Sequence, residues 1–444
     1  MLFEASNRIY IGAATLLVAA LLLGGSGSAA PLHNLLIELI ALGVLLLLAL
    51  DRDIRRRGRT YVVGTALLGL IVVTPFVQLV PMPPRLWTSM PGRDLAAAVH
   101  ALTSSSSSWR PLSLQPEATL LAAFYVLAPA AIFLSVSRLA HDRRHSIARI
   151  IVAGALLSLL LGALQLVGAG DLFLYTSGHN GNAPGLFINR NHQADIHLIG
   201  MLFSAALIAR SRQLSPGARL ALWLTAVVAF SAGVIATTSR MGFLLLPLAV
   251  LGSLWVLPVV KFRRRAATVF SCALVVAAFA AVASTARVGR VIERFSATPD
   301  ARFAFWQDAA FAARQYFPWG SGIGTFDAVF RPIENLDNVG PFYVNHAHND
   351  YLQIVAEAGL WGALLILAFI VFYALICLRL IKDRSTPDQR AACLSVAVLL
   401  LHSVGDYPLR ILSLLTLFGV FAALLLPPRP ELSRTTDDEA KQFE

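Results

Sequence analysis

Apolar residues along this 444-residue chain form long runs that are separated by short polar connections. A helix that crosses a lipid bilayer needs about 20 mostly apolar residues. Twelve runs reach or approach that length, so the pattern predicts an all-α, polytopic membrane protein with about twelve transmembrane helices. The predicted spans are Tyr10–Gly24, Leu35–Leu50, Tyr61–Val80, Thr119–Val136, Ile147–Val167, Ala194–Ala209, Leu220–Thr238, Phe243–Val260, Ala266–Ser284, Gly359–Leu378, Ala391–Val404 and Ile411–Leu426.

Composition agrees with a chain whose surface is covered by lipid. Hydrophobic residues make up 57% of the chain and charged residues only 14%, whereas a soluble domain has about 25% charged residues. The segment Ser28–Ala30 resembles a signal-peptide cleavage site. With eleven apolar segments behind it, the first run is better interpreted as an uncleaved helix.

The chain has a net charge of +11, and the distribution of its basic residues predicts the topology in the membrane. Lys and Arg concentrate in the cytoplasmic connections of membrane proteins. Every second connection here is basic, and the short connections between them carry at most one Arg. Both termini are therefore expected in the cytoplasm, and no nucleic-acid partner is expected. The basic connections are Arg52–Arg59, Arg138–Arg149, Arg210–Arg219, Lys261–Arg265 and Arg379–Arg390.

Two connections on the opposite side of the membrane are long. Residues 81–118 are rich in Pro and Ser, and the run Ser104–Ser108 is typical of a flexible linker. Residues 285–350 form the largest soluble segment, in which a stripe of apolar side chains predicts an amphipathic helix on the membrane surface, ended by Pro318. The stripe consists of Phe303, Trp306, Ala310, Ala313 and Phe317, and a turn with Gly320, Gly322 and Gly324 follows.

Polar residues gather at the helix ends that face away from the basic connections. Ionisable residues near membrane depth are costly and are functional candidates by default. A secondary transporter would instead place them near the bilayer midplane, in broken helices. A site at the outer membrane interface is therefore expected. The groups are Arg190–His197, Arg240, the run Asn345–Gln353, and His402, Asp406 and Arg410, whose spacing of four predicts one helical face.

Structural roles remain open for part of this set, and three other motifs do not support a metal or phosphate site. The His402, Asp406 and Arg410 face is also typical of a polar seam between helices, and Arg240 of an interfacial snorkelling residue. Neither a metal nor a cofactor is expected, because two of these motifs lack their partners and the third, Asp51–Asp53, is short and lies in a cytoplasmic arginine cluster. The three motifs are Asp51–Asp53, the glycine turn 320–324 without a following Lys, and His346-x-His348 without a Cys or Glu ligand.

The types of residue in these groups suit one kind of chemistry. Arginine holds phosphate oxygens bidentately at any pH, and histidine is a base near neutral pH. The helix start at His348–Asp350 adds free backbone N–H groups that favour a diphosphate. The pattern therefore suits attack by a sugar hydroxyl on a substrate with a diphosphate leaving group.

The run Asn345–Gln353 (NHAHNDYLQ), followed by Glu357–Gly362 (EAGLWG), resembles the signature of the O-antigen ligase and O-antigen polymerase superfamily of bacterial inner-membrane proteins. The resemblance covers roughly residues 175–425. Weaker matches occur in the same order as in that family: Gly185–Asn191, Ser239–Gly242, Asp300–Arg302 with Trp306, and Pro318–Phe326.

This resemblance implies a metal-independent, inverting membrane glycosyltransferase of GT-C-like architecture, with one large periplasmic loop and no cofactor. Its partners would be a glycan linked to undecaprenyl diphosphate, membrane lipid and an acceptor hydroxyl, with lipid A–core as the favoured acceptor. A repeat-unit polymerase and a protein O-oligosaccharyltransferase remain alternatives, and a secondary transporter is the alternative from another class. The implied organisation is helices 1–5 in residues 1–174, a ligase-like domain in 175–426 and a cytoplasmic tail in 427–444.

The resemblance also implies roles for individual residues. His348 would be the general base with His346 as its understudy, and Asp350 or Glu357 would orient His348. The substrate or its diphosphate would be bound by Arg240, Arg190, Arg410, Asn349, Asp350 and Asp406.

Overall fold

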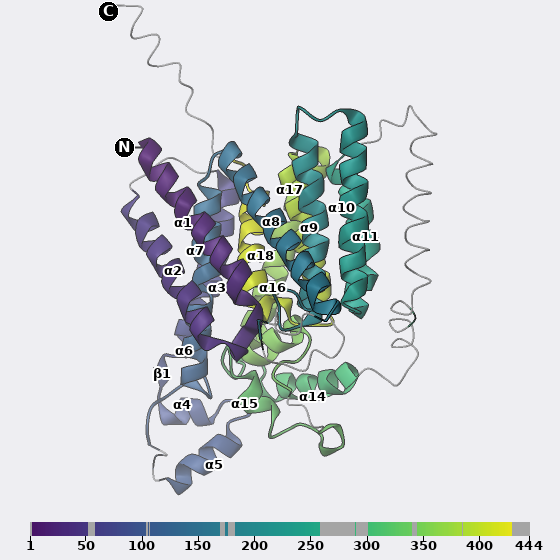
Figure 1. Ribbon diagram of the computed structural model, residues 1–444. Helices are drawn as coiled ribbons and strands as arrows, with labels where there is room; N and C mark the ends of the chain where they lie inside the picture. Colours follow the sequence, from purple (N-terminus) through teal and green to yellow (C-terminus); the bar gives the residue numbers. More distant parts are fainter. Residues whose placement is uncertain are drawn as a thin grey trace, which may run out of the picture.

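A computed structural model describes residues 2–51, 58–103, 105, 107–168, 174–175, 183–257, 289, 301–339, 344–383 and 385–428. Within these ranges the chain forms a bundle of long helices with a smaller assembly of short elements at one end (Figure 1). The all-α, polytopic membrane architecture is confirmed.

The long helices follow the predicted apolar runs. Eight helical segments among the described residues are long and apolar enough to cross a membrane, and α11 (Arg240–Val256) and α18 (Leu412–Leu425) are apolar but shorter. Helix α17 (Pro387–His402) lies on the eleventh predicted span, and the predicted span 266–284 lies outside the described residues. The eight are formed by α1 (Leu2–Leu23), α2 (Pro31–Leu50), α3 (Arg59–Gln78), α6 with α7 (Pro116–Tyr125 and Leu127–Ser137), α8 (His141–Leu166), α9 (Arg190–Arg210), α10 (Pro216–Ala236) and α16 (Asp350–Lys382).

Helix α9 is the centre of the second half of the bundle. It packs against α8, α10, α11 and α17, and almost all of its side chains are buried. Helices α9 and α11 approach closely because small side chains line their contact. A Cβ atom added to Gly242 of α11 would lie only 2.5 Å from the Cβ of Ala194 in α9. Any polar group on the first turns of α9 is therefore carried into the protein interior.

The two ends of the bundle have different chemistry. At one end, Arg144 of α8 donates to the carbonyl of Leu426 at 2.6 Å, Arg143 donates to Asn7 at 3.1 Å, and Arg210 forms an ion pair with Asp388 at 2.7 Å. We call this the basic end. Helices α9, α11 and α16 begin at the opposite end, which we call the site end (Figure 1).

The connection 81–118 is folded over most of its described length. It contains α4 (Pro84–Thr88), α5 (Asp94–Leu102) and the two-residue strands β1 (Pro81–Met82) and β2 (Arg110–Pro111). The buried Arg93 donates to the carbonyls of Leu112 at 2.7 Å and Gly320 at 3.1 Å, which joins this connection to the large loop. The linker expected over Ser104–Ser108 includes two residues, 104 and 106, outside the described residues.

The predicted amphipathic helix is α14 (Ala301–Tyr316), followed by α15 (Phe326–Phe330) and the short 3₁₀ turn η3 (Leu336–Asn338). The buried side of α14 includes only part of the expected stripe. Ala313 of the stripe is buried with Ala309, Ala312 and Tyr316, whereas Phe303 is 58% exposed. Packing of α14 against α16 determines which side is covered.

Helix α16 has a kink at Gly359, whose φ of +59° is a conformation that favours glycine. The backbone N–H groups of Ser321 and Gly322 donate to the carbonyls of Ala356 and Glu357 at 3.1 and 2.8 Å. Leu360 donates in turn to the carbonyl of Pro318 at 2.8 Å. The glycine turn of the large loop thus satisfies the backbone groups that the kink releases.

Replacing Gly359 with alanine tests this junction. The new Cβ would lie 2.0 Å from the Pro318 carbonyl oxygen and would hold a left-handed conformation. We expect Gly359→Ala to lower the free energy of unfolding by at least about 1–2 kcal/mol, seen as a lower thermal midpoint of the purified protein. Gly43→Ala, whose Cβ would meet nothing within 4 Å, is the matched control and should leave the midpoint unchanged or slightly higher. Equal midpoints for both variants would contradict this account.

Candidate active site

The backbone around His348 is held from both sides at the start of α16. Asn349 is the N-cap of α16, and its side-chain oxygen accepts from the Leu352 N–H at 3.0 Å. Trp306 of α14 donates to the His348 carbonyl at 3.1 Å. His348 itself has a φ of +49°, which is uncommon for a residue other than glycine, and residues in such conformations cluster at functional sites.

The His348 side chain is oriented by Asp406. Its Nδ1 lies 3.2 Å from Oδ1 of Asp406, which is fully buried, while the imidazole is 22% exposed. A carboxylate only accepts hydrogen bonds, so Nδ1 carries the proton and Nε2 of the neutral ring has a lone pair. Within the described ranges Nε2 has no hydrogen-bond partner. This geometry suits a general base.

Asp406 is surrounded by further donors. Arg302 of α14 lies 3.4 Å from its Oδ2, the Asn191 amide of α9 donates to the same oxygen, and the Tyr407 backbone N–H lies 3.0 Å from Oδ1. Burial disfavours the carboxylate, but the hydrogen bond from His348 and the Arg302 guanidinium hold the pKa of Asp406 well below its usual range. The side chain is therefore ionised at neutral pH.

The predicted arginines 190 and 240 lie at helix starts close to this pair. Arg190 begins α9 and donates to the Thr238 hydroxyl at 3.1 Å, two residues before Arg240 begins α11. A Cβ on Gly405 would lie 3.3 Å from Cγ of Met241, so the start of α11 touches the turn that carries Asp406. The structure thus brings both arginines to the same end of the bundle as His348.

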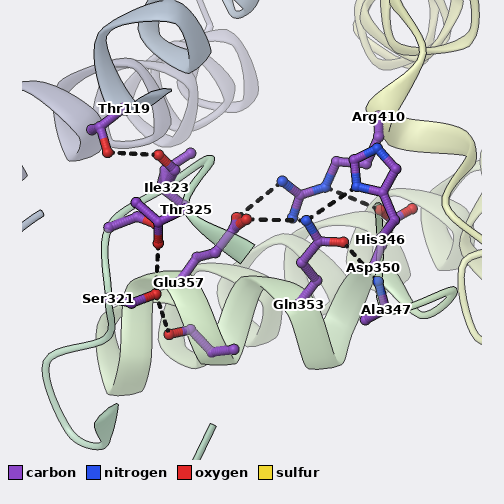
Figure 2. A network of polar contacts seen from close by, with 12 residues as sticks. Thr119, Ser321, Ile323, Thr325, His346, Ala347, Asp350, Gln353, Glu357 and Arg410 are labelled. Carbon is purple, nitrogen blue, oxygen red and sulfur yellow. Dashed lines mark hydrogen bonds and ion pairs between the residues drawn. The ribbon is translucent and has the colours of Figure 1, made fainter. Parts of the chain in front are cut away.

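Arg410 belongs to a separate polar network with two carboxylates (Figure 2). Its guanidinium lies 3.3 Å from Asp350 and 3.0 Å from Glu357. Burial disfavours its charge, but these carboxylates outweigh that effect and raise the pKa of Arg410. Asp350 also accepts from Ser403 at 2.8 Å. The expectation that Asp350 or Glu357 orients His348 is wrong, because His348 pairs with Asp406 while both of these carboxylates pair with Arg410.

The substrate-binding roles of Arg410, Asp350 and Asn349 stay predictions. Their described contacts lie within the protein: two ion pairs to one arginine and one helix cap. These contacts favour a positioning role for the first turn of α16.

The expectation that His402, Asp406 and Arg410 share one helical face is wrong. Helix α17 ends at His402, and Arg410 lies in the 3₁₀ turn η4 (Pro408–Arg410). Pro408, which lies between Asp406 and Arg410, lacks an N–H and cannot continue the hydrogen-bond ladder of a helix. The three side chains accordingly have different partners, and His402 pairs with the buried Asp195 at 2.5 Å.

Sequence reasoning missed three members of the site. The sequence indicates Arg302 only through a weak motif match and Asn191 only through a weak motif match and a polar segment, and it does not indicate Tyr407. The Tyr407 ring contacts the imidazoles of His346 and His348, with centroids 4.4 and 4.9 Å apart. Only its position directly after Asp406 offered a signal in the sequence. Among the described residues, no group of three His, Cys, Asp or Glu side chains is arranged to hold a metal ion.

Comparison with known protein families finds a match to part of the chain. The O-antigen ligase family model, Wzy_C, matches residues 225–367, a segment that includes Arg240, Arg302 and both site histidines. No curated protein matches the chain significantly. Residues 225–367 of this integral membrane protein therefore match the O-antigen ligase family, and the resemblance to the O-antigen ligase and polymerase superfamily is confirmed.

The family supports glycan transfer of the ligase or polymerase kind, on glycan and lipid-linked substrates. The matched residues lie inside the predicted ligase-like domain 175–426, whose boundaries stay a prediction.

The depressed pKa of Asp406 predicts a pH-dependent contribution to stability. A group whose folded pKa is lowered stabilises the fold above its unfolded pKa, about 3.9, and the contribution is lost as pH falls through the folded pKa. We expect Asp406→Asn to lower the thermal midpoint at pH 7. The difference from wild type should shrink as the pH falls below about 4.

Asp327→Asn is the control for this comparison. Asp327 pairs with Arg331 at 2.8 Å, but both side chains are exposed, so the pair contributes little. Its midpoint should match wild type at every pH. An Asp406→Asn difference that persists unchanged in acid would contradict the ionised state of Asp406.

Proposed function

We propose that this protein transfers a glycan from undecaprenyl diphosphate to an acceptor hydroxyl at the periplasmic face of the bacterial inner membrane. The favoured acceptor is lipid A–core, which makes the protein an O-antigen ligase. The observation that carries the proposal is the His348–Asp406 pair, in which Nε2 of His348 is available beside Arg302, and both His348 and Arg302 lie in the segment that matches the O-antigen ligase family.

The orientation follows from charge. The connections at the basic end are rich in arginine, and such connections stay in the cytoplasm. The site end would then face the periplasm, where the head group of a polyprenyl-linked donor is presented. Both termini would lie in the cytoplasm.

His348 would activate the acceptor. Its Nε2 takes the proton of the attacking hydroxyl, and the fully buried Asp406 stabilises the resulting imidazolium while fixing the tautomer. The oxygen then forms a bond to the anomeric carbon. The bond from that carbon to the diphosphate oxygen breaks, and undecaprenyl diphosphate leaves with the bonding electron pair.

Arg190, Arg240 and Arg302 would hold the diphosphate. Each is partly exposed at the site end, and guanidinium groups bind phosphate oxygens with strong charge-assisted hydrogen bonds. Arg190 and Arg240 are also the first residues of α9 and α11, where the helix dipole favours negative charge. Cleavage of the bond between the anomeric carbon and the diphosphate oxygen supplies the driving force, so neither a nucleotide nor a metal is required in this scheme.

Replacing His348 tests the role of the base. We expect His348→Ala to reduce glycan transfer by about 10²–10⁴-fold, measured on surface-glycan gels after replacement in the native bacterium. His100→Ala, in the distant helix α5, is the control and should leave the ladder unchanged. An unchanged ladder in His348→Ala would contradict the proposal.

The same gel separates ligase from polymerase. Loss of a ligase leaves bare core while lipid-linked polymer accumulates. Loss of a polymerase leaves core that carries a single repeat unit, which would overturn the proposed acceptor but not the base. An intact surface ladder with a glycoprotein lost would indicate a protein acceptor.

Direct displacement by one hydroxyl predicts inversion at the anomeric carbon. Nuclear magnetic resonance of the product should show the anomeric configuration opposite to that of the donor. A covalent glycosyl-enzyme trapped with an acceptor-free donor and detected by mass spectrometry would contradict this mechanism.

A further inference from the structure

His346 lies two residues before the base but belongs to the other polar network. Figure 2 shows its ring beside Gln353, whose amide bridges to Glu357 and to the backbone of Ala347. Gln353 Oε1 accepts from the Ala347 N–H at 3.2 Å, and its Nε2 donates to Glu357 at 3.0 Å. A backbone N–H only donates and a carboxylate only accepts, so these two partners fix the orientation of the amide.

The fixed amide in turn determines the tautomer of His346. The Nε2 of Gln353 lies 3.3 Å from Nδ1 of His346. An amide nitrogen is only a donor, so Nδ1 of His346 must accept, and the ring proton lies on Nε2. His348 has the opposite arrangement, because its Nδ1 donates to Asp406.

His346 is also held in its neutral form. Burial, followed by the positive charge of Arg410, lowers the pKa of His346 to about 3. Its Nε2–H has no hydrogen-bond partner within the described part of the chain, and the residue is partly exposed. Because the Tyr407 ring contacts both imidazoles, this donor lies beside the base.

We propose that His346 is a fixed hydrogen-bond donor and not a second base, and that its Nε2–H binds an uncharged oxygen of the acceptor sugar. This inference rests on the proposed function and specifies what the site does with the acceptor. A neutral donor matches a hydroxyl or ring oxygen, whereas the phosphate oxygens are matched by guanidinium groups. Because His346 stays neutral near pH 7, the proton of the acceptor goes to His348.

Nuclear magnetic resonance of the full chain in lipid nanodiscs, labelled with ¹⁵N-histidine, tests the tautomers without any substrate. His346 should show a proton on Nε2 and an unprotonated Nδ1 from about pH 5 to about pH 9, and His348 should show its proton on Nδ1. Spectra of His346→Gln and His348→Gln assign the two rings. A proton on Nδ1 of His346, or titration of the His346 ring in this pH range, would overturn the proposal.

Transfer kinetics with lipid-linked glycan as donor and varied lipid A–core test the donor role. We expect His346→Ala to lower kcat/KM for the acceptor by about 3- to 10-fold, the value of one uncharged hydrogen bond. The pH dependence of kcat/KM for His346→Ala should match that of the wild type. His346→Gln places an amide N–H near the position of Nε2 and should restore most of the loss.

Two kinetic outcomes would overturn the donor role. One is a His346→Ala variant that transfers as fast as wild type. The other is a variant as slow as His348→Ala with an altered pH profile, which would make His346 the base. The substrate-free spectra separate these failures from a failure of the proposed function, because the tautomers do not depend on which glycan is transferred.

Discussion

The buried carboxylate of Asp406 is the interaction on which the site depends. An ionised carboxylate inside a protein is costly unless donors surround it. The donors here come from α9, from α14 in the large loop, and from the segment before α16, through Asn191, Arg302 and His348. A single charge therefore requires three distant parts of the chain to meet, and the same contact selects the tautomer that makes His348 a base.

A second charged centre, Arg410, stabilises the neighbouring elements without taking part in that contact. Its pairing with Asp350 and Glu357 spans two turns of α16, and the kink at Gly359 fixes the same segment to the glycine turn of the large loop. The Tyr407 ring lies between the two networks and touches a histidine of each. Each network thus pairs its own charges, Asp406 with Arg302 and Arg410 with its two carboxylates. His348 and His346 belong to different networks and therefore have opposite tautomers.

The sequence predicted the bundle because lipid imposes a strong constraint on every span, namely a long apolar run. It also predicted that Arg190, Arg240, His348 and Asp406 lie at one end, because alternating charge in the connections assigns each helix end to a side. These predictions need no knowledge of how the helices pack.

The details that depend on packing were not predictable in the same way. Arg302 lies in a soluble loop, 104 positions from its partner Asp406, where neither periodicity nor hydropathy relates the two. The apolar stripe expected on α14 is only partly buried, because contact with α16 decides which residues of α14 are covered. The spacing of four between His402, Asp406 and Arg410 predicted a helix through all three residues, but α17 ends at His402.

A double-mutant cycle of transfer rates tests the central claim most directly, that His348 and Asp406 act as one unit. The account predicts that Asp406→Asn combined with His348→Ala transfers no more slowly than His348→Ala alone, because Asp406 acts through the histidine that is already gone. A double variant whose loss equals the product of the two separate losses would show that the residues act independently, and would contradict the account.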